Sequence, residues 1–467
     1  MSPSAQARRV IGVETEYGLV GRGTDRGNRL SGGEAAQWLF NPIEREHASS
    51  NVFLRNGGRL YLDVGSHPEY ATAECTGVPD LLLHERAGDE LLARLCRRAE
   101  ADAAAEGQPV ELRLFKNNVD SHGNSYGCHE NYLIARALDL PALAAALTPF
   151  LVTRQVLCGT GRWSPDGFSI SQRAEVLHDE LSSMTTRSRP LINTRDEPLA
   201  DPRRFRRLHV IAGDSNLSEP SAALKVGSLL AVLGAIEHAL ATGGALPALE
   251  LDDVAGALRA VARDPRTVLR LASGRTIGAL DVQAEYLALA GAVPVAAPWQ
   301  RVLTALGGDH EDDLDGEVEW VTKRALLRRY ADSRGLAWHD RRLAQVDLAF
   351  HEITSDESGR PRGLFRLLEA RGAAVRLTTA EAVEQALLRP PSDTRAALRG
   401  RLIRTAQAEQ RRYSVDWSQF TAFDLPQPDG TRDDRTVRLT DPLVVADQAV
   451  DELQRALSSG WSAPNHP

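Results

Sequence analysis

The chain has 467 residues, of which 42% are hydrophobic and 25% charged, and its formal net charge is −8. This length predicts roughly two or three domains, and the composition is typical of a soluble globular protein. The negative charge argues against general nucleic-acid binding, and four cysteines without a C-x-x-C pair indicate a reducing compartment rather than a disulfide framework or zinc knuckle.

The first residues, MSPSAQARRV, contain no apolar stretch, so we expect no secretory signal. The longest uncharged apolar run spans residues 226–236, well short of the ~20 residues that cross a bilayer. A cytoplasmic protein that does not enter a membrane is therefore expected.

Residues 8–20, RRVIGVETEYGLV, have the apolar pattern of a buried strand but contain two carboxylates. Alternation places Val13 and Tyr17 on the core face, and Glu14 and Glu16 together on the other. Neighbouring carboxylates raise each other's pKa, and burying them without a partner is unfavourable. Either this face is solvated or the pair binds a metal ion, and the stretch alone leaves both possibilities open.

Residues 52–63, VFLRNGGRLYLD, are predicted to form a hairpin that turns at the Asn-Gly-Gly sequence. Alternation then places Arg59, Tyr61 and Asp63 on one face. A cation, a phenol and a carboxylate in a row could be a cross-strand ion pair or part of a functional site.

Glu69 and Thr72 follow shortly afterwards, but simple alternation does not direct both toward one site. A turn or bulge near Gly65 would be needed. Several carboxylates on a curved antiparallel sheet suit Mg²⁺, which takes oxygen ligands and bridges nucleotide phosphates. The sequence has no Walker A or G-x-G-x-x-G motif, so a nucleotide would be bound by metal ions and side chains on the sheet.

The rest of the chain predicts strands and then mostly helices, an α+β pattern. We expect strands over residues 110–118, 129–136 and 203–216, and helices over 34–39, 80–106, 140–157, 218–240, 317–335 and 444–457. Asp80 is predicted to cap the second of these helices, and Gly107 to end it. Residues from about 245 to 405 should be largely helical, a smaller unit should follow, and the last ten residues should be disordered.

Two further polar stretches are ambiguous. Residues 114–133 could be a site or only a polar loop; the residues concerned are Lys116, Asn117, Asn118, Asp120, His129, Glu130 and Asn131. A later group could bind phosphates or a substrate carboxylate, or be ordinary exposed arginines; it comprises Arg187, Arg189, Arg195 and Arg207, with His209 on the same strand face as Arg207.

Taken together, these motifs resemble the Pup ligase/Pup deamidase family, whose members are glutamine synthetase-like carboxylate-amine ligases. The matching segments are GVETEYG, SSNVFLRNGGRLYLDVGSHPEYATAEC, LFKNNVDSHGNSYGCHENYL, TTRSRPLINTRDEP, RLHVIAGDSNLSE, EVEWVTKRALLRRY, VDLAFHEI and SVDW. They cover nearly the whole chain. The resemblance implies a curved antiparallel sheet packed with helices in a catalytic domain, residues 1–398, and a small C-terminal domain, residues 399–467.

The resemblance also implies an activity. Such a ligase phosphorylates the side-chain carboxylate of the C-terminal glutamate of Pup, a small disordered modifier, using ATP and Mg²⁺. It then joins that carboxylate to a lysine of a target protein by an isopeptide bond, which marks the target for proteasomal degradation. The implied partners are Pup and lysine-bearing targets, and the implied oligomeric state is a monomer.

Site residues carry over position by position from the resemblance. Asp63 matches the base that accepts the proton of the target lysine. The implied magnesium ligands are Glu14, Glu16, Tyr61 and Glu69, and the implied ATP contacts are Arg59, Thr72 and Trp417. From alternation alone, Arg207 and His209 are placed near phosphate or substrate.

Three alternatives remain. The sister enzyme of the same family is a Pup deamidase and depupylase, but it carries a long extra loop for which the segment between Glu16 and Arg59 leaves no room, and it tends to read EVEYG instead of ETEYG. A non-catalytic Pup-binding scaffold is disfavoured because every expected acid is present. A small-molecule glutamate–amine ligase is disfavoured by the full-length resemblance.

Overall fold

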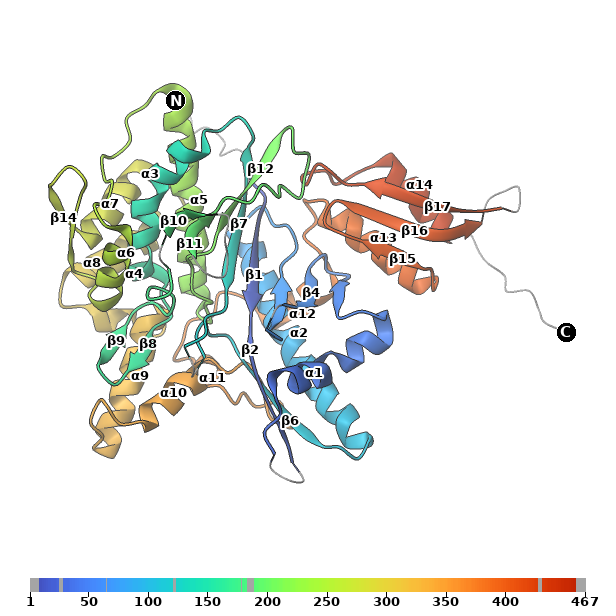
Figure 1. Ribbon diagram of the computed structural model, residues 1–467, viewed down its shortest axis with the longest axis horizontal. Coiled ribbons are helices and arrows are strands. Elements are labelled where there is room, and N and C mark those ends of the chain that lie inside the picture. The colour runs from blue at the N-terminus through green and yellow to red at the C-terminus, as the bar shows by residue number, and fades with distance from the viewer. Residues whose placement is uncertain are drawn as a thin grey trace.

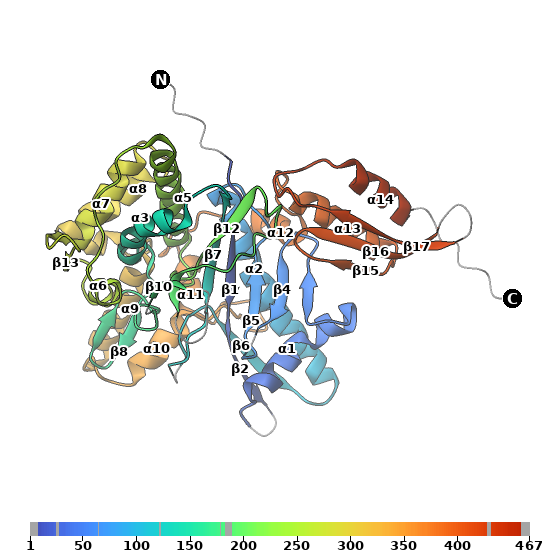
Figure 2. The same cartoon turned by 45° about the horizontal axis from the view of Figure 1, so that its top comes forward.

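A computed structural model of the protein describes residues 8–24, 28–63, 65–120, 123–177, 179–182, 189–426 and 431–458. A large mixed sheet runs through the middle of the molecule (Figures 1 and 2). Helices of the central part of the chain lie on one side of it, and the C-terminal unit lies at the opposite end. The predicted α+β class is confirmed.

The large sheet has eight strands in the order β10-β11-β12-β7-β1-β5-β4-β3. Their bounds are β10 Asp179–Ser182, β11 Pro190–Asn193, β12 Phe205–Val210, β7 Cys128–Ala135, β1 Ile11–Glu16, β5 Pro68–Ala71, β4 Arg59–Leu62 and β3 Asn51–Phe53. All neighbours are antiparallel except β10 and β11, which are parallel. The N-terminal strand β1 is therefore central, between β7 and β5.

The predicted opening strand is two strands rather than one. β1 belongs to the large sheet, whereas β2 (Gly18–Gly23) pairs with β6 (Val110–Phe115) in a separate two-stranded sheet. Tyr17 lies between them, fully buried, and its hydroxyl donates a hydrogen bond to Asp89 at 2.7 Å. The predicted alternation nevertheless holds along β1, because Val13 is buried on the core face together with Tyr17.

Two tight turns bring the site residues of β4 and β5 together. The predicted hairpin between β3 and β4 is confirmed, and Gly57 adopts the positive φ of 82° that its turn requires. A second turn, with Gly65 at φ 97° and Ser66 at φ 66°, reverses the chain between β4 and β5. This is the turn that the sequence required near Gly65.

The five longest predicted helices before the C-terminal unit are present: α1 (Gly32–His47), α2 (Val78–Ala105), α3 (Leu140–Thr153), α5 (Glu219–Thr242) and α9 (Glu319–Arg334). α1 begins at a capping box formed by Ser31 and Glu34, and it extends eight residues beyond its predicted C-terminal end, to His47. The prediction that Asp80 caps α2 is wrong: Gly77 is the N-cap, and Pro79 occupies the first turn, where it fixes φ favourably.

Shorter elements complete the central region: α4 Gln155–Cys158, α6 Val254–Arg263, α7 Ala279–Ala290, α8 Ala296–Gly307, the 3-10 helix Glu311–Leu314, α10 Arg342–Phe350, α11 Leu364–Ala370, α12 Ala380–Leu388, β8 Arg162–Ser164, β9 Gly167–Ser169, β13 Val268–Arg270 and β14 Thr276–Gly278. Among the described helices, α5 alone is long and apolar enough to cross a membrane. Its most apolar window is 61% buried within the protein, as in a core helix.

The C-terminal unit has its own small core. It comprises α13 Ala396–Ala408, β15 Tyr413–Val415, β16 Gln419–Pro426, β17 Arg432–Arg438 and α14 Gln448–Ser458. Glu74, just after β5, accepts hydrogen bonds from Arg395 at 2.8 Å and from Arg399 at 2.9 Å, and this buried ion pair joins the unit to the sheet. The boundary that we predict between residues 398 and 399 falls inside α13 and stays a prediction. The predicted disordered tail lies almost wholly outside the described residues.

Candidate active site

Three carboxylates converge at one end of β1. Glu16 lies opposite Glu69 across the β1–β5 pair, and Glu69 lies opposite Tyr61 across the β4–β5 pair. Glu16, Asp63 and Glu69 each present a carboxylate oxygen, and these three atoms lie within 4.8 Å of one another. The face of β1 that carries Glu16 therefore continues across the sheet into two further acids, Glu69 on β5 and Asp63 just after β4.

This cluster is electrostatically unfavourable by itself. Burial, together with the charges of Glu14, Glu16 and Asp63, raises the pKa of Glu69 well above its usual value. Burial and neighbouring carboxylates likewise raise the pKa of Tyr61. A bound cation would remove the repulsion, and a donor set made only of oxygen atoms fits Mg²⁺.

Glu14, also on β1, lies in a different environment, beside side chains of β7 and β12. Its Oε1 accepts a hydrogen bond from Asn131 at 3.1 Å and lies 3.5 Å from the Arg207 guanidinium. Its Oε2 lies 3.3 Å from His129 Nδ1 and 4.0 Å from His209 Nε2. Although burial opposes the effect, the His129 hydrogen bond and the nearby positive charges lower the pKa of Glu14 to about 2.

The two histidines beside Glu14 meet edge to face, with ring centroids 5.1 Å apart. Burial lowers the pKa of His209 to about 3, so its ring is neutral near pH 7. The structure brings Arg207 and His209 together on one strand face, as alternation predicted. The sequence left His129 and Asn131 undecided, although their i, i+2 spacing on a strand was a usable signal.

Arg59 is held in place at the other side of the sheet. Its Nε donates to Asn51 Oδ1 at 2.8 Å, and its guanidinium lies 4.4 Å from the Tyr61 ring centre. The rings of Phe53 and Trp417 meet edge to face, with their centroids 5.0 Å apart. The edge strand β3 therefore contacts the C-terminal unit here. Within the described part of the chain, Arg59 is thus oriented by an amide and a ring and pairs with no acid, which leaves its charge available.

A pocket lies at the Gly12 end of β1, between the sheet and the C-terminal unit. Gly12, Glu14, Thr72, Arg207 and Trp417 are among its lining residues. The Thr72 hydroxyl accepts a hydrogen bond from the backbone of β1, at Val13, and Trp417 lies 5.0 Å from the Arg399 guanidinium. Two of the predicted ATP contacts, Thr72 just after β5 and Trp417 of the C-terminal unit, therefore share one cavity at the end of β1 opposite to the three-carboxylate cluster.

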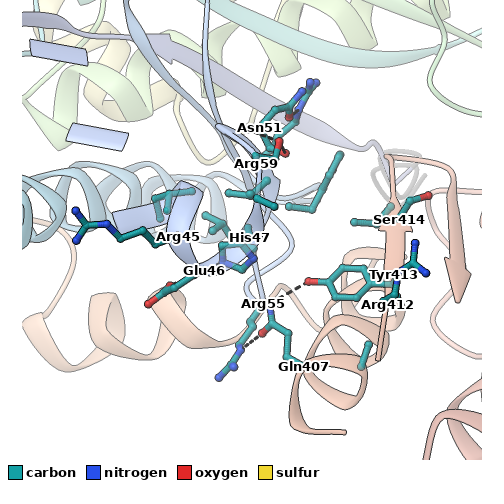
Figure 3. Close-up of a pocket in the computed structure, with 18 of the residues that line it drawn as sticks. Arg45, Glu46, His47, Asn51, Arg55, Arg59, Gln407, Arg412, Tyr413 and Ser414 are labelled. Atoms are coloured by element: carbon teal, nitrogen blue, oxygen red, sulfur yellow. Dashed lines mark hydrogen bonds and ion pairs between the residues drawn. The ribbon is translucent and has the colours of Figure 1, made fainter. Parts of the chain in front are cut away.

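A larger groove of about 1470 Å³ runs between α1, α2 and β3 on one side and α13 and β15 on the other (Figure 3). Some of its arginines pair with acids: Arg98 pairs with Glu46 at 2.8 Å, and Arg412 pairs with Asp424 at 3.0 Å. Other lining arginines pair similarly, namely Arg45 with Asp102 and Glu106, and Arg94 with Glu90 and Glu384. Arg55 and Arg59 also line this groove, and they bond the side-chain amides of Gln407 and Asn51 instead of an acid.

Most of the polar stretch over residues 114–133 stabilises the fold. Lys116 is buried and pairs with Glu85 at 3.0 Å, Glu130 is buried and pairs with Arg154, and Asp120 bonds Asn124 in a turn. Asn117 and Asn118 are also buried in internal hydrogen bonds. Of the arginines in the next group, Arg189 donates to the Ser125 carbonyl, and Arg187 lies outside the described residues.

Comparison with known proteins places these features in a single family. The family model described as Pup-ligase protein matches residues 9–421. A Pup--protein ligase of Mycolicibacterium vanbaalenii is 46% identical over 96% of this chain and 99% of its own length, and the enzyme of Nocardia farcinica is equally similar. Among solved structures, the complex between prokaryotic ubiquitin-like protein Pup and its ligase PafA has a TM-score of 0.88 at 41% identity, covering 97% of this chain and 92% of that one. PafA in complex with ADP has a TM-score of 0.79 at 42% identity, covering 98% and 99%.

Proposed function

The chain belongs to the Pup ligase family, and we propose that it is an ATP-dependent carboxylate-amine ligase. It phosphorylates the side-chain carboxylate of the C-terminal glutamate of Pup and joins it to lysines of target proteins, which marks them for proteasomal degradation. One observation carries the proposal: the family's acids, arginine and tyrosine from three separate strands meet on one face of the sheet.

The geometry supports different roles for the two ends of β1. The pocket with Thr72 and Trp417 would take the nucleotide base, and that end of the strand begins at Gly12. Base stacking on an indole ring is favourable and needs no hydrogen-bond match. The carboxylates at the Glu16 end would then face the transferred phosphoryl group and the Pup glutamate.

We propose that Glu16, Tyr61 and Glu69, with Glu14 from the neighbouring cluster, hold Mg²⁺. An ion held by these residues would supply the positive charge that phosphoryl transfer requires. The compact oxygen cluster around Glu16 supports its assignment more directly than that of Glu14, which already contacts Arg207 and His129. Arg59, which pairs with no acid among the described residues, would contact a phosphate.

We assign the base to Asp63. An amine with an ordinary lysine pKa of about 10.4 is mostly protonated at neutral pH, so it must lose a proton to react. The backbone N–H of Asp63 donates to the His67 carbonyl at 2.9 Å, which fixes the residue at the start of the β4–β5 turn. Its partly exposed side chain belongs to the three-carboxylate cluster, where an amine could approach.

The deamidase alternative is not favoured. α1 occupies most of the segment between β2 and β3, so that segment holds no long additional loop. The curated relatives reported above are ligases by name. We further propose that the protein works as a cytoplasmic monomer, which light scattering at assay concentrations and cell fractionation would test.

The decisive experiment uses Pup ending in glutamate and Pup ending in glutamine, each with Mg-ATP and a model target. An isopeptide adduct formed only with the glutamate form, and lost in Asp63→Asn, is the expected result. Conversion of glutamine to glutamate without an adduct would identify a deamidase instead. No change with either substrate would contradict an enzymatic role.

A further inference from the structure

Two arginines near the Glu16 end of the site have no carboxylate partner in the described part of the chain. Arg173 is 2% exposed, and among described residues its guanidinium donates only to the Tyr126 carbonyl, at 2.6 Å. Its Nε is buried without a hydrogen-bond partner. Arg189 donates to the adjacent carbonyl, that of Ser125, at 2.8 Å. Burial lowers the pKa of the Arg173 guanidinium even though the charges of Glu16 and Asp214, which form no ion pair with it, oppose this effect. Burying a guanidinium without a directly paired anion is unfavourable, so the two arginines suit a negatively charged ligand.

The position of Arg173 is fixed by its backbone. The Asp214 carboxylate accepts hydrogen bonds from the N–H groups of Gln172 at 3.0 Å and Arg173 at 3.2 Å, and from the Ser171 hydroxyl at 3.1 Å. Asp214 therefore holds residues 171–173 without pairing with the guanidinium. A binding group that is ordered before its ligand arrives loses little entropy on binding.

The arginine pair adjoins both Glu16 and Asp63. The Gly127 carbonyl, one residue beyond Tyr126, accepts a hydrogen bond from the Glu16 N–H at 3.2 Å. The Tyr126 ring stacks on His67 with centroids 4.6 Å apart, and His67 accepts the backbone hydrogen bond of Asp63. The pair thus lies at the end of β1 opposite to the pocket that we assign to the nucleotide base.

The substrate of the proposed reaction carries two negative charges on one residue. The C-terminal glutamate of Pup has a side-chain carboxylate, which reacts, and an α-carboxylate, which stays ionised throughout. When the side-chain carboxylate enters the acidic cluster, the α-carboxylate enters the site with it and requires a cation. A guanidinium matches the two oxygens of a carboxylate in a planar fork.

We propose that Arg173, assisted by Arg189, binds the α-carboxylate of the C-terminal glutamate of Pup. This assignment rests on the proposed function and adds a specificity device to it. A glutamate within a chain has no free α-carboxylate, so the arginine pair selects the terminal residue. The competing interpretation is that Arg173 only anchors the loop over residues 123–127.

The test compares two synthetic Pup proteins, one ending in ordinary glutamate and one ending in glutamate α-carboxamide. For the wild type, we expect kcat/KM for adduct formation to be at least about 30-fold higher with the free acid, as for a lost charged contact. In Arg173→Gln, the preference should fall to within about threefold, mainly through slower reaction of the acid. Arg189→Gln should reduce the preference partially.

Arg366→Gln is a matched control, because Arg366 is a buried arginine that pairs with Asp89 at 2.6 Å and with Glu369 at 3.0 Å. It should keep the full preference for the acid. The proposal is overturned if the wild type treats both substrates alike, or if Arg173→Gln slows both equally. Should neither form give an adduct, the proposed function fails, and fluorescence-anisotropy binding of the two Pup forms still decides the role of Arg173.

Discussion

Glu16 lies directly opposite Glu69 across the β1–β5 pair, so two neighbouring strands present carboxylates to the same small space. With Asp63, they form a cluster whose oxygens are within 4.8 Å of one another. Like charges at this separation oppose folding unless a cation or a proton lies among them. The fold therefore maintains an arrangement that a bound cation, or a proton taken up by Glu69, would stabilise.

Glu69→Gln should separate stability from metal binding. In EDTA, the variant should melt about 1–3 °C higher than the wild type, because one repelling charge has been removed. Its affinity for Mn²⁺, measured by electron paramagnetic resonance, should fall at least about tenfold. Glu357→Gln, at an exposed position, is the control and should change neither quantity. A lower melting temperature in EDTA would contradict the repulsion argument.

Asp63→Asn should slow ligation by about 10²–10⁴-fold, the usual contribution of a general base. ADP affinity should stay within about threefold of the wild type, because Asp63 lies at the opposite end of β1 from the base pocket. The residual rate should rise with pH, since more of the target lysine is then deprotonated. A variant with full activity, or with an unchanged pH profile, would exclude Asp63 as the base.

Trp417 can be tested by graded substitution. Trp417→Phe keeps an aromatic face and should weaken ADP binding only a few-fold. Trp417→Ala should weaken it by about 10–100-fold, as expected for the loss of base stacking. Isothermal titration calorimetry would measure both. Equal effects of the two substitutions would show that stacking is not the interaction that the indole provides.

The ion pair around Glu74 predicts a specific pH dependence of stability. Against the effect of burial, Arg399 and Arg395 lower the pKa of Glu74 to about 2, below the value of 4.5 expected in the unfolded chain. Its stabilising contribution is therefore present above about pH 4.5 and is lost as the pH falls toward 2.

Glu74→Gln should accordingly lower the free energy of unfolding by about 3–5 kcal/mol at pH 7, with a smaller difference at pH 3. Thermal unfolding across this range would measure it. Asp196→Asn is the control, because its pair with Arg136 is exposed and should contribute under about 1 kcal/mol. A difference that grows as the pH falls would contradict the assignment.

Local pattern was enough to predict much of this fold. Alternation placed Glu14 and Glu16 on one face, the Asn-Gly-Gly sequence predicted the β3–β4 hairpin, and apolar spacing predicted α2 and α5. These features depend on residues close in sequence. The break at Tyr17 was not predicted, because it arises where β1 and β2 pair with different partners, a property of long-range topology.

The site shows the same division. The sequence supplied the acids, but not the fact that Glu14 faces His129 while Glu16 faces Glu69, because register between strands is not encoded locally. Arg173 gave no signal of its own: it becomes distinctive only when burial, an unpartnered Nε and the distant Asp214 are seen together. Lys116 looked like a possible site residue in the sequence because its acidic partners, which lie on α2, are distant in the chain.

The ion pair that joins Glu74 to α13 also connects nucleotide binding with the attachment of the C-terminal unit to the sheet. Arg399 bonds Glu74, donates to the Trp417 carbonyl at 3.0 Å and lies against its indole ring. A nucleotide that stacks on this indole would therefore contact both the sheet and the C-terminal unit at the same interface. Nucleotide bound in the pocket should then protect the contact between β5 and α13 from proteases. A variant selected for a more stable contact between these two elements should bind nucleotide more strongly, without any change in the pocket itself.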